Sequence, residues 1–155
     1  MSFKVEILRL SQKFYQDYPL SKYPEILDKS TRSYVCLIIK VRDYNICIPY
    51  RSNVSHKDSY RFRYSQRSKD NKSGLDYRKI AIIKNPQYLE KTFSIVDNDE
   101  YRETRMNMEK IVSSAVEYID TYIRHMTGLA ILHRREFERR YTFSTLKYFH
   151  NELGL

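Results

Sequence analysis

The sequence predicts an α+β protein in which a twisted antiparallel sheet carries packed helices. Short β-branched and apolar runs fill the first half of the chain, around residues 34–50. A long apolar stripe with helical spacing fills the second half, within residues 99–127. Strands therefore come first and helices last, which is typical of this class. The length of 155 residues suits one domain, spanning residues 1–155.

Five segments are predicted to form strands. Residues 2–10 alternate in part between apolar and polar side chains, and residues 60–64 alternate strictly. Residues 34–41 and 45–50 are apolar on both faces, so we expect a hairpin of two buried central strands. Because proline cannot donate to a ladder, the second of these strands should end or bulge at Pro49.

The segment after the alternating strand is predicted as a polar connection over residues 65–74, followed by another strand over 77–83. The stripe within residues 99–127 predicts one continuous helix, capped by Asp97 or Asp99 and ended before Gly128. Shorter helices are expected after Ser11, from Pro24, and over residues 130–140 and 144–153.

The charge balance indicates a polyanionic partner. Lys and Arg number 28 against 19 Asp and Glu, which gives a net charge of +9. Such a surplus favours nucleic acid first and an anionic membrane surface second, since each neutralised phosphate releases a counterion. No apolar stretch reaches the length of a membrane span and the N-terminal segment lacks a signal-peptide core, so we expect a cytoplasmic protein without a membrane partner. Cysteine and histidine do not show zinc-site spacing, and neither a metal nor a cofactor is expected.

The segment CIPYRSNVSHK, residues 47–57, holds the candidate catalytic groups. RNA supplies its own nucleophile, the ribose 2′-OH, so an enzyme has to move protons and stabilise charge on the phosphate. Histidine changes charge near neutral pH, so His56 is a candidate acid or base. The cations Arg51 and Lys57 could stabilise a phosphorane. A stiff strand before the loop would fix where these groups begin.

The other polar residues of this segment are candidates for contact with the phosphate oxygens or the 2′-OH. They are Ser52, Asn53 and Ser55. The same composition is also found in solvated turns and in phosphate clamps that do no chemistry, so these two interpretations stay open beside catalysis.

Further cations could extend the surface for RNA. Arg61 and Arg63 alternate with the aromatic residues of the 60–64 strand and should face away from them. Arg134 and Arg135 could follow an RNA backbone, although a solvated helix face balanced by glutamates explains them equally well. The remaining candidates are Lys69, Lys72 and Lys79.

Residues 34–57, YVCLIIKVRDYNICIPYRSNVSHK, resemble the central hairpin and active-site loop of the endoribonuclease toxins of type III toxin–antitoxin systems. These form the ToxN, CptN, TenpN and AbiQ group. The resemblance is closest to the CptN and TenpN branches, because RSN is followed by a nearby HK pair. The segment SGLDYRKIAII, residues 73–83, also resembles the next strand entry of this family.

The resemblance implies a fold similar to MazF-like toxins, with a strongly twisted antiparallel sheet surrounded by helices. It implies metal-independent cleavage of RNA that leaves a 2′,3′-cyclic phosphate. By position, Ser52 matches the active-site serine of the family, Arg51 stands in place of a threonine, and Arg32 matches a site lysine. His56 and Lys57 lie where related loops carry lysines, and which of the two transfers the proton stays open.

The resemblance also implies the partners. The toxins of this family process a repetitive antitoxin RNA into pseudoknots, which inhibit them in closed protein–RNA assemblies. Cellular or phage mRNA would be the substrate, and phage defence the setting. The rival interpretation is a non-catalytic RNA-binding module that uses residues 51–57 as a clamp. A DNA-binding regulator is disfavoured because no helix-turn-helix pattern is present.

Overall fold

The computed structural model describes residues 4–27, 34–41 and 43–155. Within them the protein is α+β, as predicted, with one antiparallel sheet of six strands and six α-helices. The strands are β1 (Glu6–Arg9), β2 (Val35–Val41), β3 (Tyr44–Arg51), β4 (Ser59–Arg61), β5 (Gly74–Asp76) and β6 (Ala81–Ile83). Their order is β1-β2-β3-β5-β4, and β6 also pairs with β3.

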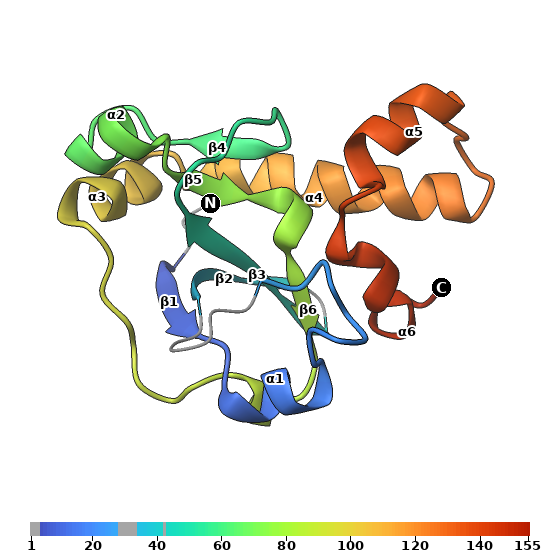
Figure 1. The fold of residues 1–155 in the computed structure, drawn as a ribbon, viewed down its shortest axis with the longest axis horizontal. Helices are drawn as coiled ribbons and strands as arrows, with labels where there is room; N and C mark the ends of the chain where they lie inside the picture. The colour runs from blue at the N-terminus through green and yellow to red at the C-terminus, as the bar shows by residue number, and fades with distance from the viewer. Residues whose placement is uncertain (1–3, 28–33, 42) are drawn as a thin grey trace.

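The helices lie around the sheet (Figure 1). The α4 helix runs behind it, with α2 and α3 on one side of the molecule and α5 and α6 on the other. The helices are α1 (Gln12–Asp17), α2 (Gln66–Asn71), α3 (Asn98–Met106), α4 (Met108–Met126), α5 (Arg134–Tyr141) and α6 (His150–Leu153). The short 3-10 helices are η1 (Tyr77–Lys79), η2 (Pro86–Tyr88) and η3 (Thr145–Tyr148). No helix in these ranges is long and apolar enough to span a bilayer.

The predicted hairpin of β2 and β3 forms the centre of the sheet. The two strands pair antiparallel from Cys36–Pro49 to Val41–Tyr44, with Leu37 opposite Ile48 and Ile39 opposite Ile46. Leu37 and Ile48 are fully buried, because β1 and β6 extend the sheet and helices cover it. This burial explains why both strands are apolar on both faces. The hairpin thereby gives the residues that follow β3 a rigid starting point.

The prediction that β3 ends or bulges at Pro49 is wrong. Pro49 pairs in register with Cys36, and the strand continues to Arg51. On the opposite edge, β3 changes partner at this place. The pairing with β6 ends at Cys47, and the pairing with β5 begins at Tyr50. A residue without an N–H group fits the gap between the two partner strands.

The polar connection and the strand predicted after it are replaced by several short elements. The predicted 60–64 strand is shorter in the structure, where β4 covers Ser59–Arg61. Ser65 then caps α2 by accepting a hydrogen bond from the backbone N–H of Ser68, and Lys72 ends that helix in the left-handed conformation. The predicted 77–83 strand is divided between η1 and β6. A capping contact can thus form a short helix in a polar segment whose sequence pattern does not predict one.

The long predicted helix is broken into α3 and α4 at Asn107. Its backbone leaves the helical range, with φ −118° and ψ 19°, and its side-chain amide donates to the carbonyl of Glu103. The Asp97 side chain caps α3 by accepting hydrogen bonds from the backbone N–H groups of Asp99 and Glu100. Asp97 was one of the two predicted caps. Gly128 has φ +78°, a conformation that ends a helix without strain only for glycine.

The terminal helices differ from the predictions in length. Ser11 caps α1 as expected. The helix expected from Pro24 is wrong, since the described residues there form turns. The expected helix over 130–140 is the shorter α5, and residues 144–153 divide into η3 and α6.

We expect Gly74→Ala to destabilise the protein. A Cβ atom at this position would lie 2.6 Å from the backbone carbonyl oxygen of Tyr60. Strands β4 and β5 would have to separate, at a cost of about 1–3 kcal/mol in the free energy of unfolding. Urea unfolding measures this loss, and Ser113→Ala on the exposed side of α4 is the control. A variant as stable as the wild type would contradict the close approach.

Candidate functional site

The loop that follows β3, residues 52–58, is fixed to the protein rather than solvated. The backbone N–H of Asn53 donates to the carbonyl of Asn71 at 2.6 Å, and that of Val54 donates to Lys72 at 3.0 Å. The Val54 side chain is 1% exposed. Asn53 has φ 60°, a conformation that asparagine tolerates better than most residues. The loop is therefore a defined structure attached to the end of α2.

A buried carboxylate, Asp76, organises the centre of this region. Its Oδ2 accepts from Arg51 Nη1 at 2.7 Å, and its Oδ1 accepts from His56 Nε2 at 3.0 Å and from the backbone N–H of Arg78 at 3.0 Å. Asp76 is fully buried. Burial, the largest influence, raises its pKa, but the hydrogen bonds and charges of His56 and Arg51 outweigh it and leave the pKa below its usual value. Asp76 thus brings two predicted site residues together.

The His56 ring is oriented by this contact. Nε2 faces Asp76, and Nδ1 is buried and makes no hydrogen bond within the described residues. The Oγ of Ser59 donates to the His56 carbonyl at 2.8 Å and fixes the backbone. A carboxylate that accepts from one ring nitrogen leaves the lone pair on the other nitrogen and stabilises the imidazolium after proton transfer. This arrangement is suited to an acid or base.

Ser52 belongs to a second chain of contacts. Its Oγ accepts from Arg67 Nη2 at 3.1 Å, and Arg67 Nη1 binds Glu100 Oε1 at 2.9 Å. Glu100 is fully buried, and its Oε2 also accepts from the hydroxyls of Ser65 and Ser73. The guanidinium of Arg67 is consequently fixed beside Ser52. A phosphate placed near this serine would meet a cation that is already in position.

A third buried acid, Asp58, closes the loop. Its Oδ2 accepts from Arg78 Nε at 2.9 Å and its Oδ1 from Arg140 Nε at 3.1 Å. Arg140 in α5 also binds Glu117 of α4. The end of the site loop is therefore attached to η1 and to the C-terminal helices. Arginine suits such a place because its planar fork binds two acids at once.

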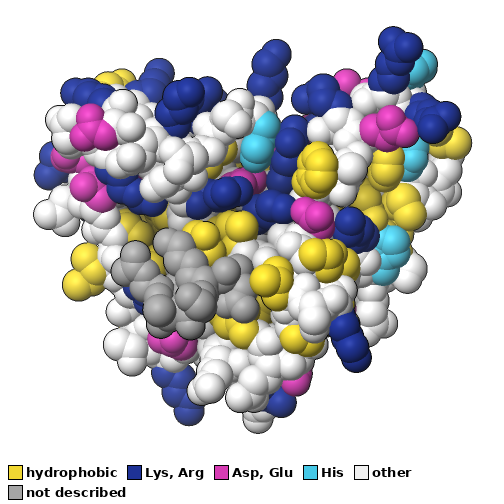
Figure 2. Space-filling model, viewed as in Figure 1, with side chains coloured by type: hydrophobic (Ala, Val, Ile, Leu, Met, Phe, Trp, Pro, Cys, Tyr) yellow, Lys and Arg dark blue, Asp and Glu magenta, His cyan; other side chains and the backbone are white. Residues whose placement is uncertain are grey.

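The remaining residues of the loop and several predicted RNA contacts are exposed. Figure 2 shows Lys and Arg side chains gathered over α2, β4 and α5 on the upper part of the face. Arg63 lies over the ring of Tyr64, with its guanidinium carbon 5.5 Å from the ring centre. The exposed residues of the predicted site are Asn53, Ser55, Lys57, Arg61, Arg63, Lys69, Lys72, Arg134 and Arg135.

Two of these exposed residues, Arg134 and Arg135, lie in α5 and make contacts within that part of the chain. Arg134 is an exposed cation of α5 that pairs with Glu138 in its own helix. The backbone N–H of Arg135, the next residue, donates a hydrogen bond to Nδ1 of His133. These contacts fit the solvated helix face considered above. Arg32 lies outside the described residues.

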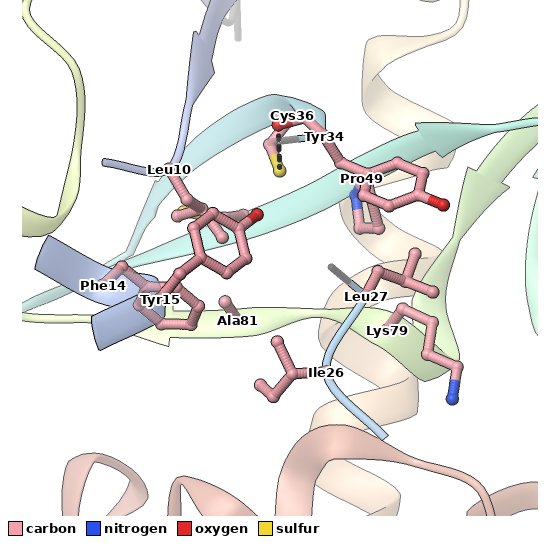
Figure 3. A pocket seen from close by; sticks show the side chains of 11 residues that line it. Leu10, Phe14, Tyr15, Ile26, Leu27, Tyr34, Cys36, Pro49, Lys79 and Ala81 are labelled. Carbon is pink, nitrogen blue, oxygen red and sulfur yellow. Dashed lines mark hydrogen bonds between the residues drawn. The ribbon is translucent and has the colours of Figure 1, made fainter. Parts of the chain in front are cut away.

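Lys79 borders a small pocket elsewhere in the fold. The pocket lies among α1, β2, β3 and β6, and Figure 3 shows its mostly apolar lining, which includes Leu10, Phe14 and Ile26. The Lys79 ammonium binds Glu25 at 2.9 Å and the carbonyl of Phe143 at 2.8 Å. It is therefore committed to structural contacts, and it does not extend the exposed basic surface.

Sequence analysis missed the groups that position the site. They are Asp76, Asp58, Glu100, Arg67 and Tyr64. The acids are scattered along the chain, and Asp76 reaches Arg51 and His56 only because β5 pairs with both β3 and β4, where Asp76 is opposite Ser59. Tyr64 was assigned to a strand face, whereas it is 65% exposed beyond the end of β4. The position of Asp76 directly before the predicted 77–83 strand was the one available signal for it.

The chain matches no protein-family model, and comparisons with curated proteins and with solved structures give no significant match. The described part of the chain also holds no group of three His, Cys, Asp or Glu side chains placed to bind a metal ion. What the site can do therefore has to be argued from its geometry.

We expect Asp76→Asn to destabilise the protein at neutral pH and to lose this effect in acid. Removing one partner of a buried ion pair usually costs about 3–5 kcal/mol. Because the folded pKa of Asp76 is depressed, its contribution is complete above the unfolded value of about 3.9 and is lost as the pH falls through the folded value.

The measurement is urea unfolding of the wild type and Asp76→Asn between pH 7 and pH 2. The difference in unfolding free energy should shrink below about pH 4. A difference that stays constant over the whole range would show that Asp76 is not the ionised partner of Arg51 and His56.

Proposed function

We propose that this protein is an endoribonuclease that cleaves RNA by transesterification, as a toxin of the type III kind. The observation that supports this most is the cluster of His56, Asp76 and Arg51 at the end of β3. In it, a buried carboxylate binds both an imidazole, which it orients, and a guanidinium. RNA transesterification needs a proton carrier and a cation for the phosphate, and no nucleophile from the protein.

In the proposed reaction, the 2′-oxygen attacks the adjacent phosphorus while its proton passes to Nδ1 of His56. A bond forms between the 2′-oxygen and phosphorus, and the bond from phosphorus to the 5′-oxygen breaks. The products are a 2′,3′-cyclic phosphate and a 5′-hydroxyl. Asp76 does not touch the RNA; it positions the ring and stabilises the imidazolium that forms. Nδ1 is buried here, so it has to become accessible before it can take this proton.

The leaving 5′-oxygen needs a proton of its own. Lys57 is exposed and adjacent in the chain to His56, so its ammonium is the proposed donor. Arg51 and Arg67 would stabilise the charge that develops on the non-bridging oxygens, and Ser52 would donate to one of them. Arg67, which is held by Glu100, is a further cation that was not predicted from the sequence.

The proposal extends to the partners. A repetitive antitoxin RNA, processed into pseudoknots and bound in a closed assembly, would inhibit the enzyme, and cellular or phage mRNA would be its target. A MazF-like, strongly twisted sheet belongs to the same proposal. Supporting it are the central hairpin, the basic face over α2, β4 and α5, and the net charge of +9. Cytoplasmic action follows from this target.

A second candidate is a module that binds RNA without cutting it. One observation favours it: four guanidiniums around the loop are each fixed by a buried carboxylate, which suits a rigid phosphate clamp. They belong to Arg51, Arg67, Arg78 and Arg140. The two candidates differ in the ends they leave. Binding without cyclic-phosphate ends would select the clamp.

We expect His56→Gln to lower the rate of RNA cleavage by roughly 10²–10⁴, the usual contribution of a general acid or base. The measurement is cleavage of a labelled RNA in the presence of EDTA, with analysis of the ends for cyclic phosphate. His133→Gln, at the exposed N-cap of α5 and outside the site, is the matched control and should cleave at the wild-type rate.

Circular dichroism has to show that His56→Gln is folded, because the ring also contacts Asp76. If folded His56→Gln cleaves at the normal rate while Lys57→Ala does not, the proton carrier is Lys57. Absence of cleavage by the wild type would overturn the enzymatic proposal.

We also expect Arg61→Glu with Arg63→Glu to weaken RNA binding and to flatten its dependence on salt. Each lost phosphate contact should reduce the slope of log K against log salt by about 0.7–0.9. Filter binding at several salt concentrations measures this. Lys40→Glu with Lys91→Glu is the control, since Lys40 lies at the hairpin end of β2, away from Arg51. If both double substitutions weakened RNA binding equally, RNA would be bound only by the overall positive charge and not by a defined surface.

A further inference from the structure

Two apolar surfaces outside the proposed site are left without a partner. One is the turn between α4 and α5, where three large side chains face solvent: Met126 is 45% exposed, Leu129 80% and Ile131 73%. The other is a groove of about 600 Å³ beside α4, between the β2–β3 hairpin and α6. We call them the turn and the groove. Exposed apolar patches of this kind mark interaction sites.

The turn is rigid. The backbone N–H of Leu129 donates to the carbonyl of Arg124 at 2.9 Å, and the N–H of Leu132 donates to Nδ1 of His125 at 3.0 Å. Gly128 supplies the positive φ that the bend needs. In Figure 1 the turn stands at one end of the molecule, away from the sheet. A partner would therefore meet apolar side chains already held in place, with little ordering cost.

The groove has an apolar floor and an acidic rim. The α4 side chains that line the floor are Val116, Ile119 and Ile123. The rim carries Asp43, Asp120, Glu152 and Lys84, and the Lys84 ammonium pairs with Asp43 at 3.5 Å. Within the described residues, neither Asp120 nor Glu152 has an ion pair. Among the described residues of the rim, three acids therefore accompany one lysine, on a chain with a net charge of +9.

The turn carries the opposite charge. Arg124, Arg134 and Arg135 flank its apolar residues, and only Arg134 among them has an ion pair in the described part of the chain, with the exposed Glu138. We propose that the turn of one molecule docks in the groove of a second copy. Apolar side chains would fill the floor while arginines meet the acidic rim, so the two surfaces match in both polarity and charge.

The positions of the two surfaces favour a twofold dimer. The groove is lined by residues 116–123 of α4, and the turn begins at Met126 at the end of the same helix. Two antiparallel copies of α4 can therefore exchange both contacts at once, which closes the assembly. One docked turn would bury too little surface for a stable complex, and the symmetric pair doubles it.

The test is the mass of the full chain in solution by light scattering after size exclusion, at about 1–100 µM, where modest interfaces dissociate. We expect twice the chain mass of 18.8 kDa at the upper end of the range. Leu129→Asp with Ile131→Asp should give a monomer throughout. Ile95→Asp, a side chain that is 89% exposed before α3, is the matched control and should remain dimeric.

Charge reversal gives a second, sharper measurement. Asp120→Lys with Glu152→Lys makes the rim positive, and Arg134→Glu with Arg135→Glu makes the turn negative. Each variant alone should be monomeric, because like charges then meet. A mixture should form a one-to-one dimer, since both of its contacts are complementary. A monomeric wild type, a dimer that survives the turn substitutions, or a mixture that stays monomeric would overturn the proposal.

Discussion

The candidate site at the end of β3 depends on the buried carboxylate of Asp76, which accepts three hydrogen bonds. An ionised carboxylate without partners could not be buried, because desolvation would cost several kcal/mol. Its partners come from the end of β3, from the loop and from η1, and each is thereby fixed relative to the others. The arrangement of Arg51 and His56 is a condition for burying Asp76.

The same device is repeated around the site. Glu100 and Glu103 project from α3 into the interior, where serine hydroxyls, Arg67, the Tyr60 hydroxyl and the backbone N–H groups of residues 63 and 64 surround them. Buried acids thus hold together a strongly basic chain whose short strands β4 and β5 bury little apolar surface of their own. The cations that remain exposed are those that the proposal above assigns to RNA contacts.

The parts of the fold that the sequence predicted are those where apolar periodicity is strong. The hairpin of residues 34–51 and the stripe of α4 follow from β-branched runs and from helical spacing. The break at Asn107 and the helix within residues 66–71 depend on single capping contacts, which periodicity does not reveal. For the site, the loop was predicted from its composition. Asp76 was not, because its role depends on the β3–β5 register.

The link between Asp58 and Arg140 has a consequence for synthesis. The two residues are 82 positions apart in the chain, yet their contact fastens the end of the site loop. Domains fold from the N-terminus as the chain leaves the ribosome. The sheet can form early, but the loop takes its final position only after residue 140 has emerged and α5 has docked. For the RNA-cleaving enzyme proposed above, the site would then be completed only late in synthesis.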